Sequence, residues 1–176
     1  MLQTKRLILD EVRGSDVETL NAIRNDPEVR IHLPTRAPES LDTTAGLIER
    51  MNEANRRQEG LNFAIRLLDA RLIGFIGLWA IHPAERWGEI GFLIGKDYWN
   101  QGYAKEALGA SLPVFQARGD CDEIRAVVHQ DNVYSLRLLA RFGFTQISIS
   151  GEMPGFEIHR LATTAPAPER TGSVAP

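Results

Sequence analysis

A glycine-bearing turn in the middle of the chain has a pattern suited to binding an anion. The apolar run Phe92-Leu93-Ile94 predicts a strand, and Gln101-Gly102-Tyr103-Ala104 stands where a helix is predicted to begin. The first amide groups of a helix have no partner within it and lie at the positive end of its dipole, which favours a bound phosphate. Gly102 would let the backbone approach an anion closely or adopt a positive φ.

Lys105 supports an anion at this turn, because a cation in the first turn of a helix opposes the helix dipole unless an anion lies nearby. The alternative is that Gly102 only shapes a turn and that Glu106 compensates the charge of Lys105. The segment matches neither the Gly-x-x-x-x-Gly-Lys-Ser/Thr pattern of a P-loop nor Gly-x-Gly-x-x-Gly. On local chemistry alone both interpretations stay open.

Glu89 is the candidate proton acceptor. It interrupts the otherwise apolar strand predicted over Trp87–Gly95, where a carboxylate is unfavourable unless it is paired or used. Partial burial would raise its pKa towards a value that suits a general base. The alternative is a glutamate at a strand end that pairs with an arginine such as Arg86.

Three polar residues, Asn132, Tyr134 and Ser135, stand where a predicted strand gives way to a predicted helix. Simple helix capping would explain Asn132 and Ser135, whereas the hydroxyl groups of Tyr134 and Ser135 are two candidate proton donors. The four histidines lack metal-ligand spacing, so no metal is expected, and Cys121 is expected to be a buried small residue.

Predicted strands and helices alternate in the second half of the chain, where these residues lie. Ser15 is predicted to cap the first helix, Gly60 to end the second, and Pro113 to kink the third or end it early. The pattern predicts an α/β fold with a mixed, mostly antiparallel sheet. Strands are predicted over 5–10, 62–67, 72–81, 87–95, 123–129, 144–150 and 156–162, and helices over 16–24, 41–57, 103–116 and 133–142.

The bulk composition is that of an ordinary globular domain. The 176 residues suggest a single domain over 1–162, and the segment 163–176, rich in Ala, Pro, Thr and Ser, is predicted to be a disordered tail. A net charge of -3 argues against a nucleic-acid partner. No apolar run is long enough to span a membrane and no signal peptide is recognised, so a cytoplasmic location is expected.

Two segments resemble signatures of the GNAT superfamily of N-acetyltransferases. Gly88–Ala107, GEIGFLIGKDYWNQGYAKEA, resembles its motif A, and Asp131–Phe144, DNVYSLRLLARFGF, is similar to the Asn-x-x-Ser and Gly-Phe signature of the RimJ/RimL branch, named for enzymes acting on ribosomal-protein N-termini. Thr4–Leu9 and Asn25–Val29 also look like that branch. Trp99 replaces the Gln or Arg of the superfamily motif, and the branch commonly has an aromatic residue there.

The resemblance implies a sheet of six or seven strands flanked by about four helices, acetyl-CoA as co-substrate and a primary amine as acceptor. The acceptor would be a protein N-terminus or a small molecule, with an aminoglycoside or a polyamine as alternatives. The resemblance also implies that the Leu93 amide polarises the acetyl carbonyl and that Glu89 takes the proton of the amine directly or through water. Ser135 or Tyr134 would then protonate the thiolate. The implied cofactor-binding residues are Phe92, Leu93, Ile94, Asn100, Gln101, Gly102, Tyr103, Ala104, Lys105, Asn132 and Ser135.

A different class of function stays open beside the enzyme. A CoA-binding sensor could keep the diphosphate turn and lack turnover, although Glu89, Asn132 and Ser135 together favour catalysis. A homodimer is compatible with the sequence, and neither the acceptor nor the oligomeric state follows from it.

Overall fold

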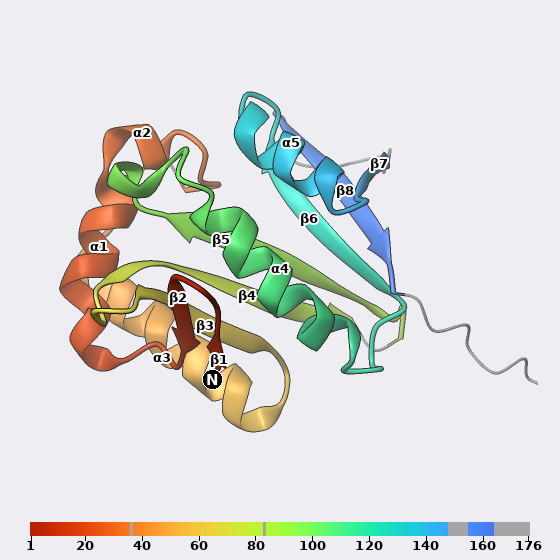
Figure 1. Ribbon diagram of the computed structural model, residues 1–176, viewed down its shortest axis with the longest axis horizontal. Coiled ribbons are helices and arrows are strands. Elements are labelled where there is room, and N and C mark those ends of the chain that lie inside the picture. Colours follow the sequence, from red (N-terminus) through yellow and green to blue (C-terminus); the bar gives the residue numbers. More distant parts are fainter. Residues whose placement is uncertain (36, 83, 148–154, 164–176) are drawn as a thin grey trace, which may run out of the picture.

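The computed structural model describes residues 1–35, 37–82, 84–147 and 155–163, and its strands form one eight-stranded sheet (Figure 1). The strand order is β1-β2-β3-β4-β5-β6-β8-β7. In the described part of the chain, β5 and β6 are parallel and the other neighbours antiparallel. The strands are β1 (Leu2–Gln3), β2 (Leu7–Asp10), β3 (Leu61–Leu67), β4 (Leu72–His82), β5 (Trp87–Ile94), β6 (Glu123–His129), β7 (Thr145–Ile147) and β8 (Phe156–Ala162).

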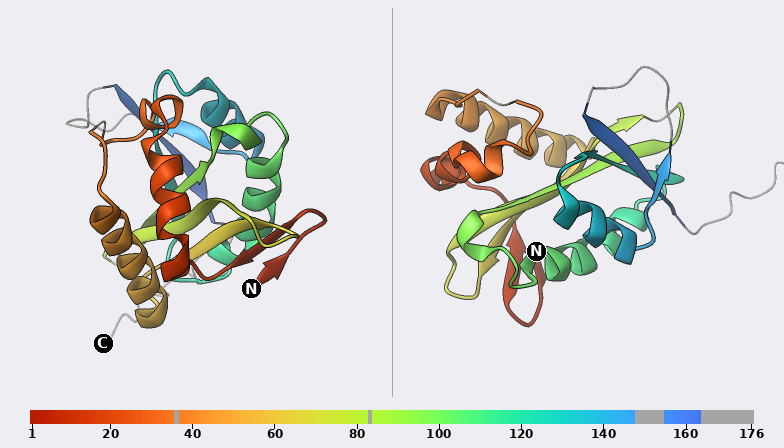
Figure 2. Two further views of the ribbon diagram at one scale, coloured as in Figure 1. Left: turned by 90° about the vertical axis from the view of Figure 1, so that its left-hand side faces the viewer. Right: turned by 90° about the horizontal axis from the view of Figure 1, so that it is seen from above.

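Helices cover both faces of the sheet (Figure 2). One face carries α1 (Val17–Asn25), α2 (Pro27–Arg30) and α3 (Leu41–Arg57), and the other carries α4 (Tyr103–Gln116) and α5 (Val133–Arg141). Two short 3-10 helices, Gly14–Asp16 and Lys96–Tyr98, precede α1 and α4. The mixed, mostly antiparallel sheet predicted from the sequence is confirmed, with the short strand β1 as an addition.

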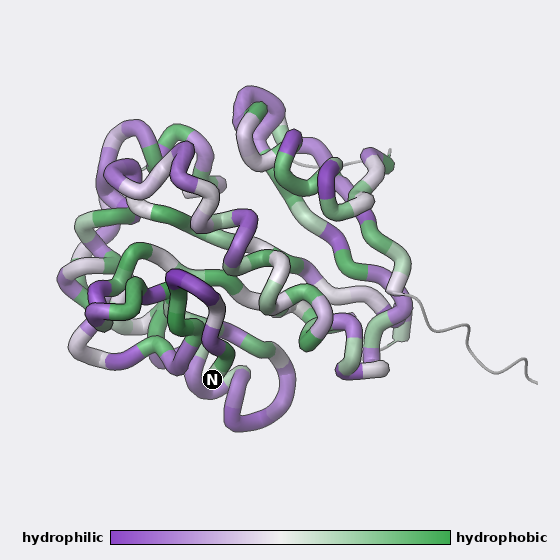
Figure 3. The backbone as a smooth tube through the Cα atoms, viewed as in Figure 1, coloured by the Kyte–Doolittle hydropathy of each residue, from purple (hydrophilic) through white to green (hydrophobic). Residues whose placement is uncertain are grey.

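Each face of the sheet has its own hydrophobic core. Leu9, Ile76 and Ile90 belong to the cluster that α4 and α5 cover, and Phe75 and Leu93 belong to the cluster beneath α1 and α3. Burial of one such side chain contributes roughly 1.5–3 kcal/mol. Figure 3 shows hydrophobic residues following the central strands. Alternate residues of β5 therefore face opposite cores, which fixes the direction in which each candidate side chain points.

Two predicted helix-capping residues are wrong. Ser15 does not cap the first helix, because residues 14–16 form a 3-10 turn and Asp16 is the N-cap residue of α1. Gly60 does not cap the second helix, because α3 ends at Arg57, as predicted, and its C-cap residue is Gln58, which adopts the left-handed conformation at φ 59°. Both errors concern single-turn geometry, which hydrophobic periodicity does not encode.

Pro113 does not end α4 early, since the helix continues to Gln116. Proline removes one N–H donor from the helix. The turn is retained because Leu112 and Phe115 on either side of it are buried in the core, and the Ala117 N–H donates to the Pro113 carbonyl at 3.0 Å.

The chain remains part of the fold as far as Thr163. Its N–H donates to the Asp122 carbonyl at 2.9 Å, and its hydroxyl donates to the Cys121 carbonyl at 2.8 Å. Thr163 therefore does not belong to the predicted tail; residues 164–176, and the predicted strand residues 148–150, lie outside the described part. Cys121 is buried as expected, and burial raises the pKa of its thiol to about 11. No helix in the described ranges is long and apolar enough to cross a membrane.

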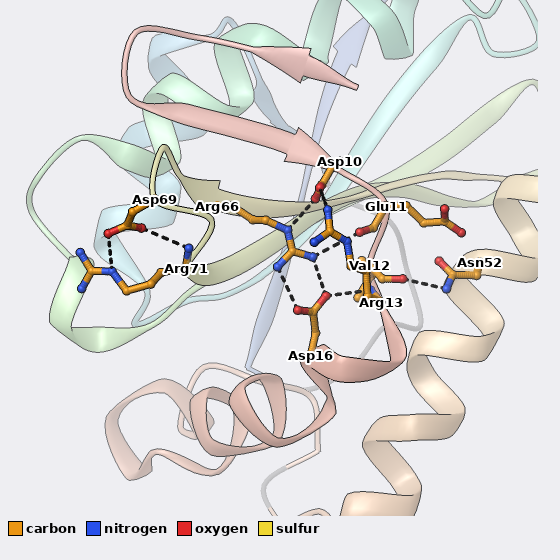
Figure 4. Close-up of polar contacts among 9 residues, drawn as sticks. All are labelled: Asp10, Glu11, Val12, Arg13, Asp16, Asn52, Arg66, Asp69 and Arg71. Atoms are coloured by element: carbon orange, nitrogen blue, oxygen red, sulfur yellow. Dashed lines mark hydrogen bonds and ion pairs between the residues drawn. The ribbon is translucent and has the colours of Figure 1, made fainter.

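A buried ionic network joins β2, β3 and the start of α1 (Figure 4). The Arg66 guanidinium, whose side chain is 4% exposed, donates to Asp16 Oδ1 at 2.9 Å, to Asp16 Oδ2 at 2.6 Å and to Asp10 Oδ1 at 2.7 Å. The Arg13 N–H also donates to Asp16 Oδ2, at 2.7 Å. A buried charge needs such complete pairing, so the network fixes the first helix against the sheet.

Candidate active site

The two parallel strands separate beside a cavity. β5 and β6 pair only at Trp87–Glu123, Gly88–Ile124 and Glu89–Arg125, although β5 continues to Ile94 and β6 to His129. Figure 1 shows the two strands diverging from their paired ends. A cavity of about 430 Å³ lies against the unpaired part of β5. The separation therefore leaves one edge of β5 available to a ligand.

The cavity brings together nearly all of the residues predicted for cofactor binding. Its wall is formed by the end of β5, the turn before α4, the start of α5 and the segment after α2. Gln101 and Glu89 do not line it. The predicted residues that do are Phe92, Leu93, Ile94, Asn100, Gly102, Tyr103, Ala104, Lys105, Asn132, Tyr134 and Ser135.

The turn before α4 has the geometry of an anion site. Gly102 is the N-cap residue with φ 79°, and no side chain caps the helix. Asn100 is also left-handed, at φ 58°. A Cβ at Gly102 would have its nearest neighbour 3.6 Å away, so glycine is required there by conformation rather than by space. The first amide groups of α4 are thus left available for an anion.

Glu106 does not compensate the charge of Lys105. The Glu106 carboxylate pairs with Arg6 at 2.7 Å and accepts from the Thr4 hydroxyl at 2.6 Å. Within the described ranges Lys105 forms no ion pair, and it lines the cavity. The alternative explanation of Lys105 therefore fails, and a cation stands beside the anion-ready turn without a carboxylate partner from the described residues.

Trp99 and Gln101 stabilise the turn through side-chain hydrogen bonds to the backbone. The Trp99 indole N–H donates to the Ile94 carbonyl at 2.7 Å, which ties the turn to the end of β5. The Gln101 side chain donates to the Asp97 carbonyl at 2.8 Å. The Gln101 side chain therefore does not line the cavity, as a cofactor contact would require, and closes the turn instead.

The backbone at Leu93 comes unusually close to β4. A Cβ built on Gly74 would lie 1.9 Å from the Leu93 carbonyl oxygen, so only glycine fits at that position. Leu93 itself lines the cavity. The absence of a side chain at Gly74 therefore leaves room for the Leu93 carbonyl group.

Glu89 is partly buried in the part of β5 that pairs with β6, and it does not line the cavity. Its Oε1 accepts from the Trp79 indole N–H at 3.3 Å, and Trp79 lies over Gly91, where a Cβ would be 2.2 Å from the ring. Burial raises the pKa of Glu89, while the Trp79 hydrogen bond and the charge of His82 oppose that change. Arg86 pairs with Asp122 at 2.7 Å, so the predicted alternative of an Arg86–Glu89 pair is wrong.

The start of α5 places three polar side chains on the cavity wall. Asn132 Oδ1 accepts from the Ser135 N–H at 3.1 Å, which confirms the capping interpretation of Asn132. Ser135 is half-buried, and its hydroxyl has no hydrogen-bond partner among the described residues, whereas Tyr134 is 63% exposed. Both hydroxyls remain available as proton donors.

His32 is a wall residue that sequence reasoning missed. Its ring lies 6.3 Å from that of His129, and its Nδ1 is buried with no hydrogen-bond partner in the described part of the chain. Burial and the neighbouring His129 lower the pKa of His32, with Asp131 acting in the opposite direction. His32 stands in a polar, proline-bearing loop with no periodic pattern, so no sequence signal marked it. The described residues include no group of three or more His, Cys, Asp or Glu placed to hold a metal.

Comparison with known proteins identifies the family. The profile of the acetyltransferase (GNAT) domain matches residues 6–145. This chain belongs to the GNAT family of acetyltransferases. An uncharacterized N-acetyltransferase of Bacillus subtilis, YoaA, is 32% identical over 146 residues, which are 82% of each chain.

Solved GNAT structures share the fold at low sequence identity. RimL, a ribosomal L7/L12 alpha-N-protein acetyltransferase in complex with coenzyme A, superposes with a TM-score of 0.77 at 18% identity, covering 90% of this chain and 95% of that one. A spermidine N-acetyltransferase from Vibrio cholerae, in complex with CoA and spermine, gives a TM-score of 0.75 at 18% identity, covering 91% and 97%. The predicted GNAT family is thus confirmed by the profile match, and the RimL structure shows that the fold is shared.

Proposed function

We propose that this GNAT acetyltransferase transfers the acetyl group of acetyl-CoA to a primary amine. The observation that carries the proposal is the uncapped start of α4, with Gly102 at positive φ and Lys105 without a carboxylate partner among the described residues, on the wall of a cavity beside the open edge of β5. The structural neighbours RimL and the spermidine acetyltransferase were crystallised with CoA, which supports the same co-substrate here.

The cofactor would lie along the wall in a defined direction. Its diphosphate would contact the amides at the start of α4 and Lys105, because an anion is stabilised there by unpaired N–H groups and the helix dipole. Its pantetheine would pair with the Phe92 and Ile94 amides along the edge of β5. The Leu93 amide would polarise the acetyl carbonyl.

The acceptor amine must be neutral before it can attack. At pH 7 an α-amine with an ordinary pKa needs only about 1 kcal/mol for deprotonation, whereas a lysine side chain needs about 4–5 kcal/mol. A modest base is therefore sufficient for a protein N-terminus. In our proposal Glu89 accepts this proton through water, because its carboxylate does not line the cavity.

The leaving thiolate needs a proton as the amide forms. Ser135 is the proposed donor, because the first turn of α5 holds its hydroxyl on the wall with no competing partner among the described residues. Tyr134 is the alternative donor and is more exposed. Ser135→Ala and Tyr134→Phe separate these two assignments.

Among the described wall residues, the ionisable groups besides tyrosine are His32, Lys105 and Arg141, with no carboxylate. This wall therefore suits an anionic cofactor, and the expected preference for an α-amine rests on its lower cost of deprotonation.

The proposal is tested by measuring free-thiol release from acetyl-CoA in the presence of N-terminal peptides, aminoglycosides and polyamines. We expect thiol release that requires an amine and is fastest with an α-amine. Tight CoA binding without amine-dependent release from any of these acceptors would favour the sensor alternative. An absence of CoA binding would contradict the proposed function altogether.

A further inference from the structure

The loop between β1 and β2 lies against the turn that begins α4, about a hundred residues further along the chain. β1 and β2 pair at Leu2–Leu9 and Gln3–Ile8, which brings Thr4 and Arg6 to the tip of a hairpin. Every polar contact described below crosses from this tip to the turn or to the first turn of α4. Neither Thr4 nor Arg6 lines the cavity, so the proposed chemistry does not account for them.

Arg6 holds the turn on both sides of Gly102. Its Nη1 donates to the Gln101 carbonyl at 2.9 Å, and its Nε donates to Glu106 Oε2 at 2.7 Å. Its guanidinium also lies 4.4 Å from the centre of the Tyr103 ring, within the range of a cation–π interaction. The rigid fork of arginine suits three simultaneous contacts of this kind, which lysine cannot reproduce.

Among the described residues, all hydrogen-bond donors to the Glu106 carboxylate come from the β1–β2 hairpin. Its Oε1 accepts from the Thr4 hydroxyl at 2.6 Å and from the Arg6 backbone N–H at 2.9 Å, in addition to the Arg6 side chain on Oε2. The Glu106 side chain is 18% exposed. The hairpin therefore neutralises a carboxylate that stands one turn from the proposed diphosphate and would otherwise repel it.

We propose that Thr4, Arg6 and Glu106 form a clamp that preorganises the cofactor-binding turn, with Arg6 as a positioning residue for the diphosphate. The clamp rests on the proposed function, since it acts on the turn to which CoA is assigned. Asn100 adopts the left-handed conformation, which is unfavourable for residues other than glycine. Such a conformation persists where the surrounding contacts enforce it. A turn already held in its bound conformation loses less conformational entropy when the ligand arrives.

The decisive variant is Glu106→Gln, because two explanations predict opposite signs. Simple electrostatics predicts tighter CoA binding when a negative charge near a diphosphate is removed. The clamp predicts weaker binding, because the ion pair that holds Arg6 against the turn is lost. We expect the dissociation constant for CoA, measured by calorimetry, to rise about tenfold.

Arg6→Ala should weaken binding at least as much, and Arg6→Lys should fail to restore it although it keeps the charge. Arg86→Ala is the matched control, since Arg86 forms a comparable exposed pair with Asp122 at 2.7 Å and donates to the Gly119 carbonyl at 3.0 Å without lining the cavity, and it should leave the dissociation constant unchanged. In turnover we expect a raised KM for acetyl-CoA and a nearly unchanged kcat.

The outcomes separate the clamp from the proposed function. If the wild-type protein does not bind CoA, the proposed function fails and the clamp with it. If the wild type binds CoA and the Glu106→Gln and Arg6→Lys variants bind it equally well or more tightly, the clamp is overturned while the proposed function stands. Melting curves of each variant ensure that binding is compared between folded proteins.

Discussion

The chemistry proposed for Glu89 depends on its surroundings more than on its identity. Glu89 accepts one hydrogen bond from Trp79, and Gly91 provides the space for that indole ring. Burial is the largest influence on this carboxyl group and raises its pKa above the ordinary value of 4.5. A carboxylate with a raised pKa is a stronger base when it is ionised.

Glu89→Gln should keep the packing of β5 and CoA binding but lower turnover about 10²–10⁴-fold at neutral pH, the usual contribution of a positioned base. The loss should shrink as pH rises, because more of the acceptor is then already neutral. Wild-type activity should fall as pH decreases through the raised pKa of Glu89, and this acidic limb should flatten in the variant. Pre-steady-state and steady-state rates across pH measure both effects.

Glu85→Gln is the matched control for this variant, since Glu85 is exposed four residues earlier and the same atoms change. It should behave as the wild type. If Glu89→Gln retains wild-type rates and an unmoved profile, the proton goes to another group, and His32 on the cavity wall is the next candidate.

At the scale of elements, the sheet is joined to the first helix by a buried charge network. Burial alone would raise the pKa of Asp16, but the hydrogen bonds from Arg66 and from the Arg13 N–H lower it below its ordinary value of 3.8. The folded protein therefore binds this proton less readily than the unfolded chain. The stabilisation is present above the ordinary pKa and is lost as the pH falls through the lower pKa of the folded state.

Asp16→Asn should lower the free energy of unfolding by roughly 3 kcal/mol at neutral pH, because Arg66 is left incompletely paired in the interior. The difference from wild type should shrink as the pH is lowered below the ordinary pKa of 3.8 and through the lower pKa of the folded state. Asp69→Asn, in the exposed pair with Arg71, should change stability by less than about 1 kcal/mol. Urea unfolding at several pH values measures all three proteins, and equal losses in the two variants would contradict the assigned role of the network.

The sequence predicted the elements well where side chains repeat with a clear period. The helix over Leu41–Arg57 and the strands at the centre of the sheet follow from apolar spacing, which reports burial of one face. It could not predict the two-residue strand β1, whose existence depends on its pairing with β2. The capping residues Asp16 and Gln58 were missed because single backbone angles decide them.

The candidate site was predictable in part for the same reason. Gly102 and Lys105 carry a local signal, since an anion site at a helix start is built from neighbouring residues. The divergence of β5 from β6, which creates the cavity, is a property of strand pairing and leaves no local pattern. The contact of Arg6 with Glu106 and the presence of His32 on the wall depend on long-range packing in the same way.

At the scale of the whole molecule, the cavity wall is assembled from β5, α4, α5 and the segment after α2. A ligand that binds there contacts elements on both sides of the gap between β5 and β6. Such a ligand stabilises the folded state by mass action, so acetyl-CoA is expected to raise the melting temperature. The family match over 6–145 spans the same elements.

Removal of residues 164–176 should leave the fold and turnover intact. The segment is rich in Ala and Pro and offers few side chains that could fill a core. Thr163 should be retained, because it bonds to the backbone at Cys121 and Asp122. Melting temperature, kcat and mass by light scattering compare the two lengths, and a large fall in any of them would show that the segment docks on the domain or on a second copy.

The binding of acetyl-CoA to Gly102→Asp, measured by calorimetry, tests the proposed diphosphate site most directly. The substitution brings a side chain and a negative charge into the anion-ready turn, so we expect binding and the thermal shift to be lost. Gly119→Asp is the matched control, since Gly119 is exposed, has φ 75° and has open space around it. We expect that variant to bind as the wild type does. Unchanged affinity in Gly102→Asp would contradict the diphosphate site and the function built on it.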